Sequence, residues 1–129
     1  MNTKVLMAIS AIALGALGVI LTFAPEEVAH LFDFPDSTAI LFQILGALYF
    51  GFAMLNWTAK GNLIGGIYGR PVTIGNFTHF LIGGLALIKL VLHNANWTYI
   101  LACAIFYLIF ALLFGWIFFT NPASVNKAA

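Results

Sequence analysis

The chain has 129 residues, of which 63% are hydrophobic and 7% are charged, and its mean hydropathy is +1.05. A water-soluble domain needs more polar side chains to cover its surface, so the composition indicates one membrane domain over residues 1–129. The net charge of +1 leaves no basic patch for a phosphate backbone, which excludes nucleic acid as a partner. The lone Cys103 has no second cysteine for a disulfide or a thiolate metal site.

Four apolar segments are long enough to cross a hydrocarbon core of about 30 Å as helices. Strands are disfavoured because an isolated strand in lipid leaves its backbone groups unpaired, whereas a helix satisfies them internally. The predicted fold is therefore all-α, a four-transmembrane-helix bundle. Its spans cover residues 5–24, 38–58, 72–93 and 97–120.

The first segment is interpreted as a retained helix, because its apolar run of about 20 residues exceeds the roughly 7 to 15 of a signal peptide. One side of this helix carries small residues at steps of three and four. Such a stripe allows another helix to approach closely when lipid removes the hydrophobic drive for association. We expect it to pack within the chain, with a dimer interface as the alternative. The stripe consists of Ala8, Ala11, Gly15, Gly18 and Thr22.

The connection between the first two spans holds all four acidic residues, Glu26, Glu27, Asp33 and Asp36. Pro25 followed by two glutamates is typical of a helix start. The sequence predicts a short interfacial helix that begins there and is ended by Pro35. A plain solvated loop is the alternative interpretation.

Turn and capping residues mark the other boundaries. Asp36 and Ser37 are expected to cap the second span, and Asn96 the fourth. Pro71 is expected in the first turn of the third span, where a missing N–H is tolerated. The glycine-rich but apolar loop before Pro71 is expected to fold onto the membrane face, and its glycines match no nucleotide-binding pattern.

Basic residues indicate an orientation. Lys4, Lys60, Arg70 and Lys127 fall on the side shared by the two termini and the second loop, and the other two loops contain no lysine or arginine. The positive-inside rule therefore places both termini in the cytoplasm of a multi-pass inner-membrane protein.

The third span is the most polar of the four. A helical wheel puts Gly75, His79, Gly83, Ala86, Leu90 and His93 on one side, with Lys89 at its edge. Phe77, Leu81, Ile88 and Leu92 fall on the opposite side. The first side is expected to face protein and the second lipid. Because ionisable groups in a bilayer are costly, Lys89 and His79 are candidate functional residues.

Depth along the helices predicts two polar clusters. Lys89, Gln43, His93 and Asp36 fall near the outer face, where Asp36 or Asp33 is a candidate partner for Lys89. The alternative is that Lys89 only extends its ammonium to the headgroups. A cytoplasmic cluster comprises His79, Asn76, Asn56 and Arg70, and a structural hydrogen-bonding role for His79 is the alternative there.

No metal, cofactor or catalytic residue is predicted. His79 and His93 are about 21 Å apart along one helix, too far to share a metal. Haem ligation by both residues would need histidines from a second copy of the chain, so a homodimeric haem protein is a minor alternative. Since no serine or cysteine is placed with a base and an acid, enzyme activity is disfavoured.

Three stretches carry a resemblance: FAPEEV, FQILGALYFGFAMLNW and GNFTHFLIGGLALIK. In layout the chain resembles small bacterial four-helix membrane proteins of the DoxX-like type. Some members of that type are linked to quinone-coupled redox complexes, but this chain has no cysteine pair or quinone motif to support that role.

Two functions follow as hypotheses. The favoured one is a non-enzymatic bundle that binds a lipid-like apolar molecule or serves as an accessory subunit of a membrane complex. The alternative is a small oligomeric transporter or channel with His79 and Lys89 lining the path. The expected partners are membrane lipids, together with a second copy of the chain or a membrane-complex subunit.

Overall fold

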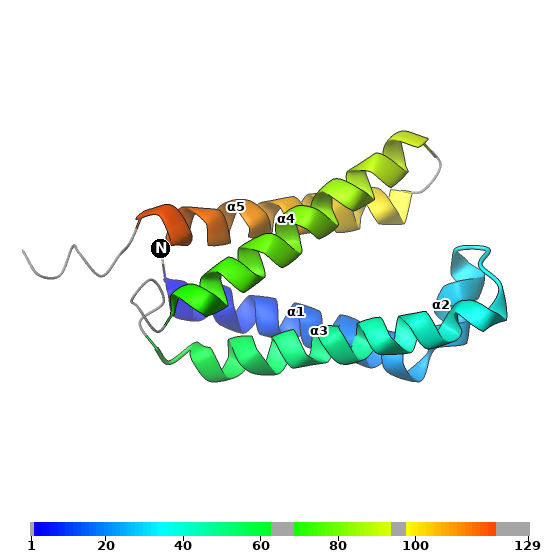
Figure 1. Cartoon of the computed structure of the whole chain (residues 1–129), viewed down its shortest axis with the longest axis horizontal. Helices are drawn as coiled ribbons and strands as arrows, with labels where there is room; N and C mark the ends of the chain where they lie inside the picture. Colours follow the sequence, from blue (N-terminus) through cyan, green and yellow to red (C-terminus); the bar gives the residue numbers. More distant parts are fainter. Residues whose placement is uncertain (1, 63–68, 94–97, 121–129) are drawn as a thin grey trace, which may run out of the picture. The chain divides into compact units, whose positions relative to one another are not determined.

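The computed structural model describes residues 2–62, 69–93 and 98–120, and the regular structure in these ranges is all helical. Four helices are long and apolar enough to cross a membrane, and a short helix lies between the first two (Figure 1). These findings confirm the all-α prediction with four long helices. The helices are α1 (Thr3–Phe23), α2 (Pro25–Leu31), α3 (Ala39–Ala59), α4 (Arg70–His93) and α5 (Thr98–Thr120), with a 3-10 turn at Asp36–Thr38 before α3.

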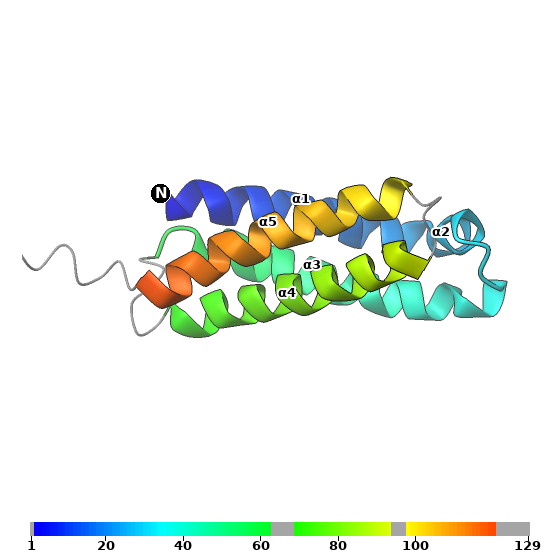
Figure 2. The ribbon, with the colours of Figure 1, turned by 90° about the horizontal axis from the view of Figure 1, so that it is seen from above.

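The chain divides into two compact units, Met1–Gly61 and Asn62–Ala129. We call them the first hairpin, formed by α1 and α3 with α2 between them, and the second hairpin, formed by α4 and α5. Each hairpin pairs two antiparallel long helices (Figures 1 and 2). The prediction of one membrane domain stays a prediction. Asn96, Lys127 and most of the glycine-rich loop lie outside the described residues.

The short helix α2 is ended by its own backbone. Asp33 adopts a positive φ of 55°, and its N–H donates to the carbonyl of His30 at 3.1 Å. The N–H of Phe34 donates to the carbonyl of Ala29 at 2.9 Å, which completes a Schellman motif. The prediction that Pro35 ends this helix is therefore wrong, because the helix stops four residues earlier.

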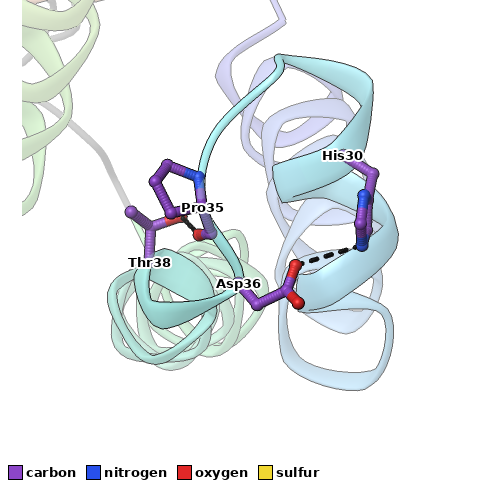
Figure 3. Close-up of polar contacts among 4 residues, drawn as sticks. All are labelled: His30, Pro35, Asp36 and Thr38. Atoms are coloured by element: carbon purple, nitrogen blue, oxygen red, sulfur yellow. Dashed lines mark hydrogen bonds and ion pairs between the residues drawn. The ribbon is translucent and has the colours of Figure 1, made fainter.

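The expected cap of the second span is also wrong. The chain enters α3 through the 3-10 turn, with Thr38 already in a helical conformation, so no extended residue is in place to cap α3 with its side chain. The Thr38 hydroxyl instead donates to the carbonyl of Pro35 at 2.7 Å, and Asp36 pairs with His30 (Figure 3). Pro71 lies in the first turn of α4, as predicted.

The small-residue stripe of α1 packs against α3 within the first hairpin. A Cβ atom at Gly18 would lie 2.8 Å from the Phe50 nitrogen and 2.9 Å from the Gly46 oxygen. A Cβ at Gly46 would meet the Gly18 carbonyl at 2.9 Å, so the two backbones touch where both residues are glycine. This contact confirms the expectation of packing inside the chain.

A buried hydrogen bond joins the same two helices. The Asn56 side-chain amide donates to the Ser10 hydroxyl at 3.0 Å, and this hydroxyl donates to the Met7 carbonyl at 2.9 Å. Both Ser10 and Asn56 are fully buried. The bond fixes the register of α1 on α3, because sliding either helix by one residue would separate the two side chains.

The second hairpin is built around an aromatic core. Phe80 of α4 is fully buried, and its ring stacks on Phe114 of α5 with 5.8 Å between centroids and 9° between planes. Phe110 and Tyr107 approach the same ring to 5.0 and 5.2 Å. The α4 face toward α5 thus combines this large aromatic side chain with two small residues, Gly83 and Gly84, which Tyr107 and Leu108 of α5 approach closely.

The predicted division of α4 into a protein side and a lipid side is wrong in part. Its buried residues, Thr73, Asn76, Phe80 and Gly84, fall between the two predicted sides, and Ala86 is exposed. Phe77, expected to face lipid, lies across Gly115 of α5, where an added Cβ would be 3.0 Å from the ring. Apolarity alone cannot separate these sides, because lipid and protein contacts both favour apolar residues.

Candidate apolar site and polar residues

An apolar groove runs between α4 and α5 in the second hairpin. Its volume is about 490 Å³, compared with about 300 and 390 Å³ for two apolar grooves in the first hairpin. The lining residues are Phe77, Leu81, Leu108, Ala111, Leu112, Gly115, Trp116 and Phe119. These side chains offer dispersion contacts, with almost no polar surface to orient a polar ligand.

Two glycines and an alanine shape this groove. Gly115 leaves room for the Phe77 ring, and Gly84 allows Leu108 and Tyr107 to approach α4 closely. Ala111, a small residue, adds little side-chain volume to the lining. Small residues beside bulky ones leave a hollow that the side chains of α4 and α5 do not fill. Leu112 and Trp116, which are 75% and 66% exposed, stand at its open side.

The residues of the predicted cytoplasmic cluster have separate surroundings. Asn56 belongs to the first hairpin and bonds Ser10, whereas Arg70, Asn76 and His79 belong to α4. The buried Asn76 amide donates to the Val72 carbonyl of its own helix at 2.9 Å. Arg70 is exposed at the start of α4. The cluster as a whole stays a prediction.

His79 is half-buried in an aromatic setting. Its ring lies 5.1 Å from that of Phe80 and 5.5 Å from that of Tyr107. Tyr107 comes from α5 and is buried, so His79 takes part in the contact between the two helices. The sequence did not single out Tyr107. The feature that identifies Tyr107 as a candidate is a phenol in the middle of an otherwise apolar span.

The predicted outer cluster is likewise divided between the hairpins. Gln43 and Asp36 are exposed in the first hairpin, and Lys89 and His93 are exposed on α4. The Asp36 carboxylate lies 3.1 Å from Nε2 of His30 (Figure 3). His30 is not a predicted partner of Asp36, although an acid and a histidine in one short connection are a usable signal. Pairing of Lys89 with an acid stays a prediction.

Among the described residues, no group of three or more His, Cys, Asp or Glu side chains is arranged to hold a metal ion. His79 is half-buried and His93 is exposed near the end of the same helix. The haem and transport hypotheses, which both use His79, stay predictions.

The four long helices define the class of protein to which the chain belongs. Four long apolar helices make the chain a multi-pass α-helical membrane protein. Comparison of the chain with models of known protein families, with curated proteins and with solved structures found no match.

Proposed function

We propose that this chain is a non-enzymatic membrane protein that holds a lipid-like apolar molecule along α4 and α5. The groove of about 490 Å³ between these helices carries the proposal. Its lining is apolar and partly aromatic, which suits the hydrocarbon chain of an acyl or isoprenoid lipid. A lipid chain that fills the hollow gains contacts that a smooth helix surface does not offer.

The proposal includes the setting of the protein. We propose that it lies in a bacterial inner membrane, as the resemblance to DoxX-like proteins implies, with both termini in the cytoplasm, as the basic residues that flank the spans indicate. The resemblance to DoxX-like proteins extends the proposal to a role as an accessory subunit of a membrane complex. In that role the bound lipid would be held at the contact with a partner subunit.

Filling the groove tests the proposal. Leu112→Trp enlarges a side chain of the groove lining that is already 75% exposed, so it should leave the hairpin folded. We expect native mass spectrometry from mild detergent to show lipid-sized adducts on the wild type and a clear loss of them in this variant.

The matched control is Ile105→Trp, which changes an exposed residue of α5 outside the groove lining. This variant should keep the adducts of the wild type. A stable wild-type protein without adducts would refute the proposal. So would equal adduct levels in the two tryptophan variants.

A further inference from the structure

We infer that the groove between α4 and α5 is a site for an anionic phospholipid, with one acyl chain in the groove and the phosphate bound by Arg70. This inference rests on the proposed function and assigns a headgroup to it. It depends on the position of Arg70, on the level of Trp116 and on the charges of the second hairpin.

Arg70 lies on the groove side of α4. It precedes Phe77 by seven residues and Leu81 by eleven, and both of these side chains line the groove. Seven residues complete nearly two turns, so the three residues share one side of the helix. The rise from Arg70 to Phe77 is about 10.5 Å. A chain in the groove therefore runs toward Arg70 at the end of the hairpin.

Trp116 places the headgroup level at the same end. It lies four residues before the end of α5 at Thr120, and the antiparallel pairing brings this end beside the start of α4 (Figure 2). Tryptophan favours the boundary between hydrocarbon and headgroups. The exposed Trp116 ring therefore marks the depth at which the acyl chain gives way to glycerol and phosphate, close to the level of Arg70.

Charge selects an anionic headgroup. Residues 62–129 contain no Asp or Glu, so the second hairpin offers no carboxylate side chain to neutralise Arg70. A guanidinium binds a phosphate through two parallel N–H donors, a geometry that an ammonium does not match. A phospholipid with a net negative charge satisfies Arg70 better than a zwitterionic lipid, whose ammonium would be repelled.

The test is a lipid titration of the full chain in mild detergent, followed by native mass spectrometry. The probes are phosphatidylglycerol and phosphatidylcholine with identical acyl chains. We expect the wild type to bind phosphatidylglycerol more tightly by roughly tenfold, the size of a charge-assisted contact. Arg70→Gln should remove this preference by weakening phosphatidylglycerol more than phosphatidylcholine, and Arg70→Lys should restore only part of it.

Lys89→Gln is the matched control, because it removes a positive charge from the other end of α4. It should keep the preference for phosphatidylglycerol. A preference that survives Arg70→Gln, or that Lys89→Gln abolishes equally, overturns the inference. If both lipids bind equally to the wild type but are lost in Leu112→Trp, the inference fails and the proposed function stands. If neither lipid binds, both fail.

Discussion

Ser10 and Asn56 show how single polar residues act inside an apolar hairpin. Both are fully buried, and the Asn56 amide donates to the Ser10 hydroxyl across the contact of α1 and α3. In lipid the hydrophobic effect does not distinguish one apolar helix face from another. A directional bond between two side chains therefore contributes more to the register of α1 on α3 than it would in a soluble core.

Replacing Ser10 by Ala should destabilise the first hairpin. The substitution removes the acceptor of the Asn56 amide while keeping the shape of the side chain nearly unchanged. We expect a loss of about 0.6–2 kcal/mol in the free energy of unfolding, the range of interhelical hydrogen bonds in membranes. Titration of sodium dodecyl sulfate into mixed micelles measures this energy.

Thr58→Val is the control for that measurement. The Thr58 hydroxyl is exposed and donates to the Met54 and Leu55 carbonyls of its own helix, so its removal breaks no contact between helices. Equal losses of unfolding free energy in the two variants would mean that the bond between Asn56 and Ser10 does not stabilise the contact of α1 and α3.

The helix pair α1 and α3 depends on the absence of two Cβ atoms. An alanine at Gly46 would put its methyl group 2.9 Å from both the Gly18 oxygen and the Thr22 nitrogen, which are backbone atoms. Relief of that clash requires the helices to move apart. Gly46→Ala should therefore cost about 1–3 kcal/mol of stability, as other overpacking substitutions do.

Gly51→Ala gives the matched comparison in the same helix. A Cβ at this position meets nothing within 4 Å, and alanine is the better helix former. We expect no loss of stability or a small gain in the same unfolding titration. A loss as large as that of Gly46→Ala would show that glycine matters in α3 for backbone reasons and not for close packing.

The pair α4 and α5 depends on the aromatic ring of Phe80 as well as on small residues. Phe80→Ala removes the ring that contacts Tyr107, Phe110 and Phe114, and it leaves a cavity between the helices. We expect a loss of about 1–3 kcal/mol in the free energy of unfolding. This loss is smaller than in a soluble core, because lipid solvates the Phe80 ring once the helices separate. Ile82→Ala, at an exposed position of the same helix, should change stability by less than about 0.5 kcal/mol. Similar losses for both would contradict the aromatic core.

For the whole molecule, the distribution of charge predicts the orientation in the membrane. All acidic residues lie between positions 26 and 36, whereas Lys4, Lys60 and Arg70 lie at the opposite ends of the long helices. In a Cys103→Ala background, we expect Asp36→Cys to react with an impermeant maleimide on intact cells. Asn62→Cys should react only after permeabilisation, because α3 separates the two positions.

The opposite labelling pattern would reverse the proposed orientation. Labelling of both cysteines from the same side would contradict a membrane crossing by α3. Total labelling in detergent serves as the control for cysteine reactivity, since Asp36 and Asn62 are both exposed.

Much of the fold could be predicted because membrane helices are specified locally. The spans expected at 5–24, 38–58 and 72–93 correspond to Thr3–Phe23, Ala39–Ala59 and Arg70–His93 within a few residues. Length, apolarity and the need to satisfy every backbone group decide these elements without tertiary contacts. The short helix that begins at Pro25 could also be predicted, because a proline and two glutamates are typical of a helix start.

The sequence by itself determined that this protein is helical, where its long helices lie, and that the small residues of α1 would take part in packing. Only the tertiary structure decided how the helices pair. It placed Gly18 against Gly46 and Asn56 against Ser10 in the first hairpin. In the second hairpin it placed Phe77 across Gly115, and both residues line the apolar groove. These contacts escape a sequence pattern because lipid-facing and protein-facing sides are both apolar, so shape and single hydrogen bonds choose between them.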